Sequence, residues 1–143
     1  MPDETPHRTA DELTTVMAQL TRRLRAASAQ EELTPSQTSV LGRLSREGPA
    51  TTAALARSEL VRPQSMRLTL AALEERGLIA RTPDPSDGRQ VVFSLTEAGV
   101  RLHGAGRRNR RSWLADAIEG ELNPDEQQAL AAAVPLLQRL VAW

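Results

Sequence analysis

The sequence predicts a mainly α-helical fold that carries one small β-hairpin, and three observations lead to this prediction. Of the 143 residues, 40% are hydrophobic, mostly leucine and alanine, and only 2% are aromatic, which favours helices over a sheet-based core. Apolar residues recur at helical spacing in the N-terminal, central and C-terminal parts of the chain. A turn-rich stretch, residues 84–89, separates two short strand-like runs. The length suits one domain with helical extensions.

The N-terminal part predicts a disordered arm followed by a helix. Residues 1–9 are polar and we expect them to be disordered. From Ala10 to Ala29 the apolar residues have helical spacing, which predicts an amphipathic helix. Its apolar stripe consists of Leu13, Val16, Met17, Leu20 and Leu24. A break is expected at residues 30–33.

A capping signal predicts the second helix. Thr34 is followed by Pro35 and, three positions on, by Gln37. This is a capping box with proline in the first helical position, where its missing N–H does no harm. The helix is predicted to run to about Arg46, and residues 49–51 can form a short strand. Its buried stripe is predicted to be Val40, Leu41 and Leu44.

The centre of the chain predicts a helix-turn-helix. A threonine at position 51 or 52 caps a short third helix that ends at Ser58. After a turn at residues 60–61, Pro63 begins a fourth helix that ends at Gly77. Two helices with so short a turn form a helix-turn-helix. In the fourth helix the stripe facing the core is predicted to be Met66, Leu70 and Leu73.

A hairpin with a basic tip follows the fourth helix. Residues 78–82 and 90–95 read as two strands, and Arg89 lies in the polar turn between them. A helix followed by such a hairpin is the layout of a winged helix. In that layout the helix can enter a DNA major groove while the hairpin tip reaches a neighbouring minor groove.

Two further helices are predicted after the hairpin. Thr96 caps one that runs to about Gly120, and Asn123 with Glu126 caps the last one. Gly99, Gly104 and Gly106 weaken the start of the fifth helix, so packing must stabilise it. The last helix has an apolar stripe of Leu130, Val134, Leu137, Leu140 and Val141.

These elements predict a winged helix-turn-helix flanked by N- and C-terminal dimerisation helices. The predicted segments are an arm and dimerisation helix at 1–33, a DNA-binding lobe at 34–96 and dimerisation helices at 97–143. The terminal helices carry more apolar surface than a small winged lobe can cover, so we expect a homodimer, the commonest oligomer. The alternative is a monomer whose terminal helices fold back.

The charge distribution favours a nucleic-acid partner although the net charge is zero. All 18 basic residues are arginine, and residues 57–111 hold eleven of them against six acidic residues. Residues 112–143 hold one arginine against five acidic residues. Local potential, and not total charge, governs attraction to phosphate.

Several function classes are disfavoured. The chain has no cysteine, which excludes disulfides and thiolate metal sites. No apolar run approaches the ~18 residues of a membrane-spanning helix, and the polar N-terminus is no signal peptide, so we expect a cytoplasmic protein. The only histidines are His7 and His103, and neither belongs to a catalytic or metal-binding pattern. We therefore expect no enzyme activity, no metal and no cofactor.

Residues 73–99 closely resemble the MarR family of bacterial transcriptional regulators. The matching elements are Leu73-Glu74 with Gly77-Leu78, the Asp87-x-Arg89 motif, and Leu95-Thr96-Glu97-x-Gly99. The chain length and flanking helices extend the resemblance to nearly the whole chain. It implies that the terminal helices form the dimer interface and that a small-molecule effector binds between them and the winged lobe, but it names no ligand-binding residue here.

Five residues at the start of the fourth helix are candidates for DNA contact. Gln64 suits adenine and Arg67 suits guanine, each through two hydrogen bonds in the major groove. Ser65 suits a phosphate. Arg62, held extended by the following proline, suits the DNA backbone. Leu68 departs from the family, which often has a polar residue there; it either touches a thymine methyl group or simply packs.

The hairpin supplies three more candidates. A guanidinium at its tip, that of Arg89, fits a narrow A·T-rich minor groove, and the resemblance implies the same role. Asp87 is expected to brace the wing or orient Arg89. Arg81, like Arg57, is a lesser phosphate candidate. Without the resemblance, a solvated surface turn would be the favoured interpretation of this tip.

We therefore predict a homodimeric winged-helix transcription factor, most simply a repressor, that binds a pseudo-palindromic operator in double-stranded DNA. Such a reader needs two half-sites about 34 Å apart. The alternative is a winged helix used only as a protein-interaction module, which Leu68 favours. The arginines at 107, 108, 110 and 111 are expected to be a mainly solvated cluster.

Overall fold

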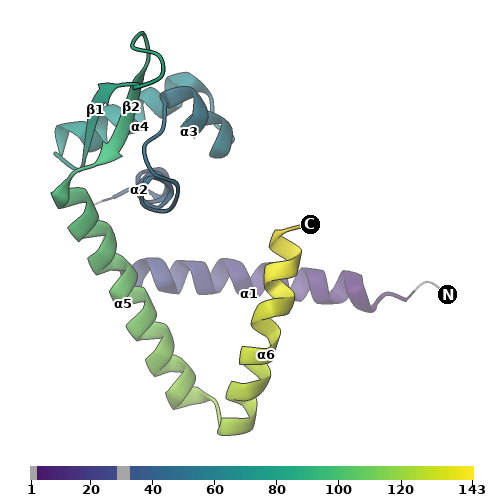
Figure 1. Ribbon diagram of the computed structural model, residues 1–143. Helices are drawn as coiled ribbons and strands as arrows, with labels where there is room; N and C mark the ends of the chain where they lie inside the picture. The colour runs from purple at the N-terminus through teal and green to yellow at the C-terminus, as the bar shows by residue number, and fades with distance from the viewer. Residues whose placement is uncertain (1–2, 29–32) are drawn as a thin grey trace. The chain divides into compact units, whose positions relative to one another are not determined.

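The computed structural model describes residues 3–28 and 33–143, and that part contains six helices and a two-stranded sheet (Figure 1). In chain order these are α1 Thr5–Ala27, α2 Pro35–Glu47, α3 Thr52–Ser58, α4 Pro63–Glu75, β1 Ile79–Pro83, β2 Val91–Leu95, α5 Glu97–Glu121 and α6 Pro124–Val141. They confirm the predicted fold class. The chain divides into two compact units. We call Ser28–Arg107 the winged unit, and Met1–Ala27 with Arg108–Trp143 the terminal unit.

Helix α1 begins earlier than its sequence predicted. Residues 5–9, expected to be disordered, are helical. The carboxylate of Asp3 accepts a hydrogen bond of 3.0 Å from the Thr5 N–H, which satisfies one of the free N–H groups at the helix start. The expected break falls on residues 30–32, outside the described residues, and on Leu33, which is buried.

The predicted capping boxes are confirmed. The Thr34 hydroxyl accepts from the Gln37 N–H at 3.1 Å, and the Gln37 side chain accepts from the Thr34 N–H at 3.0 Å. Asn123 and Glu126 form the same pair of bonds at the start of α6, at 2.9 and 3.0 Å. Each box satisfies two N–H groups that no helical carbonyl can reach.

The hydrophobic core lies in the winged unit and joins α2, α3, α4 and the hairpin. Its members are Leu33, Val40, Leu41, Leu44, Leu55, Ala56, Met66, Leu70, Leu73, Leu78, Ile79 and Phe93. The stripes predicted for α2 and α4 are therefore both buried. Strands β1 and β2 pair antiparallel, from Ile79 opposite Leu95 to Pro83 opposite Val91. Ala50 makes one additional bridge to Phe93, so the short strand expected at residues 49–51 is reduced to a single pair.

The terminal unit exposes most of its apolar surface within one protomer. No residue of α1 or α6 is buried. Between α1 and α5, the Arg23 guanidinium lies 5.2 Å from the centre of the Trp113 ring, a cation–π contact. No helix among the described residues has the length and apolar character needed to span a membrane.

The hairpin and the start of α5 meet without room for a side chain at Gly99. The Thr96 hydroxyl donates to the Gly77 carbonyl at 2.6 Å and accepts from the Gly99 N–H at 3.1 Å. A Cβ atom on Gly99 would lie 2.1 Å from the Leu78 carbonyl oxygen. The glycine therefore permits α5 to begin against the backbone that follows α4.

A partly buried ion pair joins the turn of the helix-turn-helix to helix α2. Arg43 Nε lies 2.9 Å from Glu59 Oε1, and the Ser39 hydroxyl donates to Glu59 Oε2 at 2.7 Å. Partial burial by itself would raise the pKa of Glu59, but the hydrogen bonds from Arg43 and Ser39 outweigh it and hold that pKa below its ordinary value. Glu59 directly follows α3, so this pair fixes where the turn leaves that helix.

We expect Gly99→Ala to lower the free energy of unfolding by about 1–3 kcal/mol, because the new methyl group would overlap backbone that cannot move aside cheaply. The matched control is Gly120→Ala in the same helix, where a Cβ meets nothing within 4 Å. That change should be neutral or stabilising by up to about 1 kcal/mol. Urea titrations of both variants make the comparison, and equal effects would contradict the close approach at Gly99.

We expect Glu59→Gln to lower the free energy of unfolding by about 1 kcal/mol near neutral pH. Folding lowers the pKa of Glu59, so the ionised carboxylate stabilises the folded protein fully at pH values above the pKa of the unfolded chain. This stabilisation is lost as pH falls through the lower pKa of the folded protein. The wild-type and variant curves should therefore begin to converge as pH falls below the ordinary glutamate pKa of about 4.3 and should coincide only below the lower pKa of the folded protein. The exposed Glu75, changed to Gln, serves as the control and should follow the wild type throughout. A pH-independent difference for Glu59→Gln would contradict the ionic explanation.

Candidate nucleic-acid interface

The helix-turn-helix consists of α3, the turn at residues 59–62, and α4. Thr51 caps α3, with its hydroxyl accepting from the Ala54 N–H at 3.1 Å. Leu60 has a φ of 55° and its side chain is exposed; this left-handed backbone turns the chain towards α4. Arg62 is extended and makes no side-chain cap on α4. The first N–H groups of α4 are therefore not covered by a capping side chain.

Helix α4 is divided lengthwise into a buried and an exposed half. Met66, Leu70 and Leu73 are buried to 2% exposure or less. Gln64 and Leu68 lie one turn apart on the opposite side, and both are exposed. Arg67 and Ser65 are also exposed and flank this line. The five residues that the sequence proposed at the start of α4 thus form one exposed surface, which we call the α4 face: Arg62, Gln64, Ser65, Arg67 and Leu68.

Arg67 lies on the side of α4 that faces the hairpin. Its Nη1 donates a long hydrogen bond of 3.4 Å to the Gln64 side-chain oxygen. A hollow of about 390 Å³ lies beside it, between the start of α3, α4 and β2. The lining residues are Thr51, Thr52, Ala53, Pro63, Arg67, Gln90 and Val91.

The hairpin tip is closed by its own polar groups and carries Arg89 outward. The Asp84 N–H donates to the Gln90 carbonyl at 2.8 Å, and the Gln90 N–H donates to the Asp87 carbonyl at 3.0 Å. Asp87 Oδ1 accepts from both the Arg89 N–H, at 3.1 Å, and the Arg89 Nε, at 3.3 Å. The Arg89 side chain is nevertheless 93% exposed. Asp87 therefore orients the guanidinium and leaves most of it free to bind an anion.

Arg81, which the sequence suggested as a phosphate contact, is held by the protein itself. Its Nε and Nη2 donate to the two carboxylate oxygens of Glu74 at 2.9 and 2.8 Å. Its guanidinium carbon lies 5.4 Å from the centre of the Phe93 ring. The Arg81 guanidinium also holds the pKa of Glu74 below its ordinary value. Arg81 thus joins the base of the hairpin to α4, and about half of its side chain remains exposed.

Sequence reasoning missed Glu74 and the residues that line the hollow beside Arg67. Glu74 is seven positions before Arg81, with the Gly77 turn between them, so no periodic pattern links the pair. Thr52 and Gln90 come together only because the hairpin folds back over α3 and α4. These residues could be recognised only from the approach of distant segments in space, and a single sequence does not show that approach.

The arginine cluster on α5 is mainly solvated, as expected. Arg107, Arg108 and Arg111 are exposed, and Arg110 is half-buried. In the described part of the terminal unit, no ion pair joins Arg108, Arg110 or Arg111 to an acidic residue.

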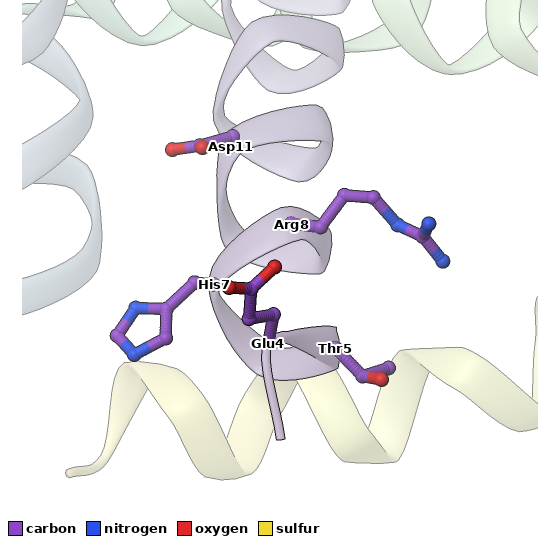
Figure 2. A pocket seen from close by; sticks show the side chains of 5 residues that line it. All are labelled: Glu4, Thr5, His7, Arg8 and Asp11. Carbon is purple, nitrogen blue, oxygen red and sulfur yellow. The ribbon is translucent and has the colours of Figure 1, made fainter. Parts of the chain in front are cut away.

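A second hollow, of about 550 Å³, lies on the first turns of α1. Figure 2 shows its lining side chains, which point in different directions from one helix and do not converge on a common point. They are Glu4, Thr5, His7, Arg8 and Asp11. Within residues 3–28 and 33–143, no group of three histidine, aspartate or glutamate side chains is placed to hold a metal ion.

Comparison with known proteins agrees with this geometry. A model of the MarR family matches residues 33–91. An uncharacterised HTH-type transcriptional regulator of Mycobacterium bovis is 40% identical over 134 residues, which cover 94% of this chain and 93% of that protein. The HTH-type transcriptional repressor NicR of Pseudomonas putida is 29% identical over 90% of this chain and 83% of its own length. A crystal structure of a protein described as a transcriptional regulator of Pseudomonas aeruginosa superimposes with a TM-score of 0.87, at 35% identity and 99% coverage of both chains.

Proposed function

Because this chain belongs to the MarR family, we propose that it is a homodimeric repressor that binds a pseudo-palindromic operator in double-stranded DNA. The family consists of non-enzymatic, DNA-binding transcriptional regulators, and this chain is one of them. One observation carries the finer proposal. A single unit presents both the exposed α4 face and a wing tip whose arginine is 93% exposed.

The α4 face enters the major groove in this proposal. Gln64 and Arg67 contact base edges, and Ser65 and Arg62 contact the DNA backbone. Arg89 enters the adjacent minor groove, where a narrow A·T-rich segment has enhanced negative potential. Asp87 orients Arg89, and Arg81 supports the wing from its base while offering its exposed edge to a phosphate.

The terminal unit provides the dimer interface in this proposal. Val16 and Met17 of α1 are each 54% exposed, and Val134 of α6 is 46% exposed. Apolar stripes of this length are not left in water when a second copy can cover them. The segments proposed from the sequence are 1–33 and 97–143 for dimerisation and 34–96 for DNA binding, so the dimerisation segments extend beyond the terminal unit by residues 28–33 and 97–107. The two-fold symmetry then requires an operator of two related half-sites.

The proposal includes repression of transcription at the operator and release of the protein from the operator by a small molecule. A relative named as a repressor shares 29% identity with this chain, and a dimer that covers its operator blocks access to the DNA. A small-molecule effector would release the operator only if it binds the DNA-free state more tightly than the DNA-bound state. No ligand residue is assigned.

We expect the protein to bind a duplex from its own upstream region far more tightly than a scrambled duplex, with affinity falling steeply as salt rises. Arg89→Ala should weaken this binding by about tenfold or more. It should also reduce the number of counterions released on binding, read from the slope of log affinity against log salt concentration, by about one per subunit. Fluorescence anisotropy measures both. Arg139→Ala, which removes the same charge from the terminal unit, is the control. Equal losses in the two variants would remove the wing from the mechanism.

We expect Val134→Glu to raise the dimer dissociation constant by on the order of a hundredfold, because a buried interface would have to accept an unpaired carboxylate. Sedimentation velocity over a range of concentrations measures the shift from dimer to monomer. Leu60→Glu, at an exposed leucine of the winged unit, is the control and should stay dimeric. A dimer that tolerates Val134→Glu would place the interface elsewhere.

A further inference from the structure

We propose that Leu68 is a specificity-determining residue that contacts the 5-methyl group of a thymine in the major groove. The inference rests on the proposed function, because it names one chemical group that the α4 face recognises. It goes further by predicting which base the operator must contain.

Leu68 lies on the exposed half of α4. A single exposed leucine is ordinary on a protein surface, but this one lies at the centre of the exposed half of α4. It is one turn after Gln64 and opposite the buried Met66 and Leu70, and 68% of it is exposed. A leucine at this point is presented to whatever the helix binds.

Leu68 does not pack against the hydrophobic core of the winged unit. The apolar contacts of α4 are already made by Met66, Leu70 and Leu73. Leu68 belongs neither to the core cluster nor to the partly buried hydrophobic residues that pack against it, among the residues described. The alternative left open by the sequence, that Leu68 simply packs, is therefore not the arrangement in the winged unit.

The chemistry of the major groove favours a thymine as the partner of Leu68. Base edges in the major groove present hydrogen-bond donors, hydrogen-bond acceptors and one large apolar group, the thymine methyl. A leucine that covers a donor or an acceptor of a base deprives that group of its hydrogen-bond partner, whereas a leucine against the thymine methyl makes an apolar contact without this cost. Arg67 and Gln64, which are joined by a hydrogen bond at 3.4 Å, supply polar contacts beside it.

The geometry also limits where this thymine lies. Residues four apart on a helix are about 6 Å apart along its axis, close to two base-pair steps of about 3.4 Å. The thymine met by Leu68 and the adenine suited to Gln64 should thus lie within about two steps of each other. Glu75 continues the same exposed line at the end of α4, and its negative charge confines the DNA contact to the earlier turns.

The test uses full-length protein and an operator selected from a pool of randomised duplexes. Each thymine is replaced in turn by deoxyuridine, symmetrically in both half-sites, which removes only the methyl group and preserves pairing. We expect one position at which the wild type loses about fourfold in affinity per half-site. In Leu68→Ala the same replacement should have no effect, while replacements elsewhere act as in the wild type. Leu60→Ala, which truncates another exposed leucine, should behave like the wild type at every position.

The outcomes separate this inference from the proposed function. Specific operator binding without any Leu68-dependent thymine would overturn the inference and leave the proposed function standing. Failure to select any duplex over random DNA would overturn both. The deoxyuridine series on the wild type requires no variant to fold, and matching thermal unfolding curves for Leu68→Ala and the wild type establish that the variant comparison is sound.

Discussion

The division of α4 into a buried and an exposed half is the constraint on which the rest of the structure depends. Met66, Leu70 and Leu73 fill the centre of the core against α2, α3 and the hairpin. This burial fixes the rotation of the helix about its axis, and it therefore decides that Gln64, Arg67 and Leu68 face outward. Loss of one core leucine by truncation typically costs about 2–5 kcal/mol, so the exposed surface is held by strong packing and not by its own contacts.

The hairpin is anchored at its base and exposed at its tip. Three contacts between distant segments hold the base: the paired backbone of Ala50 and Phe93, the two hydrogen bonds from Arg81 to Glu74, and the Thr96 hydroxyl on Gly77. The tip has only local hydrogen bonds around Asp87. In the proposed function, an anchored base with a solvated tip would deliver Arg89 to a DNA groove while leaving its side chain able to adjust. In this respect the wing complements the fixed surface of α4.

The two units differ in how their apolar surface is treated. The winged unit buries a complete core, with six of its large side chains below 2% exposure. In the terminal unit, α1 and α6 bury no residue within the protomer. Charge does not divide in the same way, because the winged unit holds ten arginines and nine acidic residues, and the terminal unit holds eight arginines and nine acidic residues. The arginine surplus of residues 57–111 is therefore a local feature of the chain that crosses the boundary between the two units.

What the sequence determined by itself was the local structure. Caps such as Thr34 with Gln37, the Met66–Leu70–Leu73 stripe and the turn residues before Arg89 act between residues a few positions apart, so their patterns are visible in one sequence. The early start of α1 was missed, although the hydrogen bond from the Thr5 N–H to Asp3 at that end is also local. Only the tertiary structure decided that Arg81 binds Glu74, that Arg43 binds Glu59 and that Leu68 stays outside the core. These contacts depend on which distant segments of the chain pack together. The burial of the whole hydrophobic core decides that packing, and no short stretch of sequence records it.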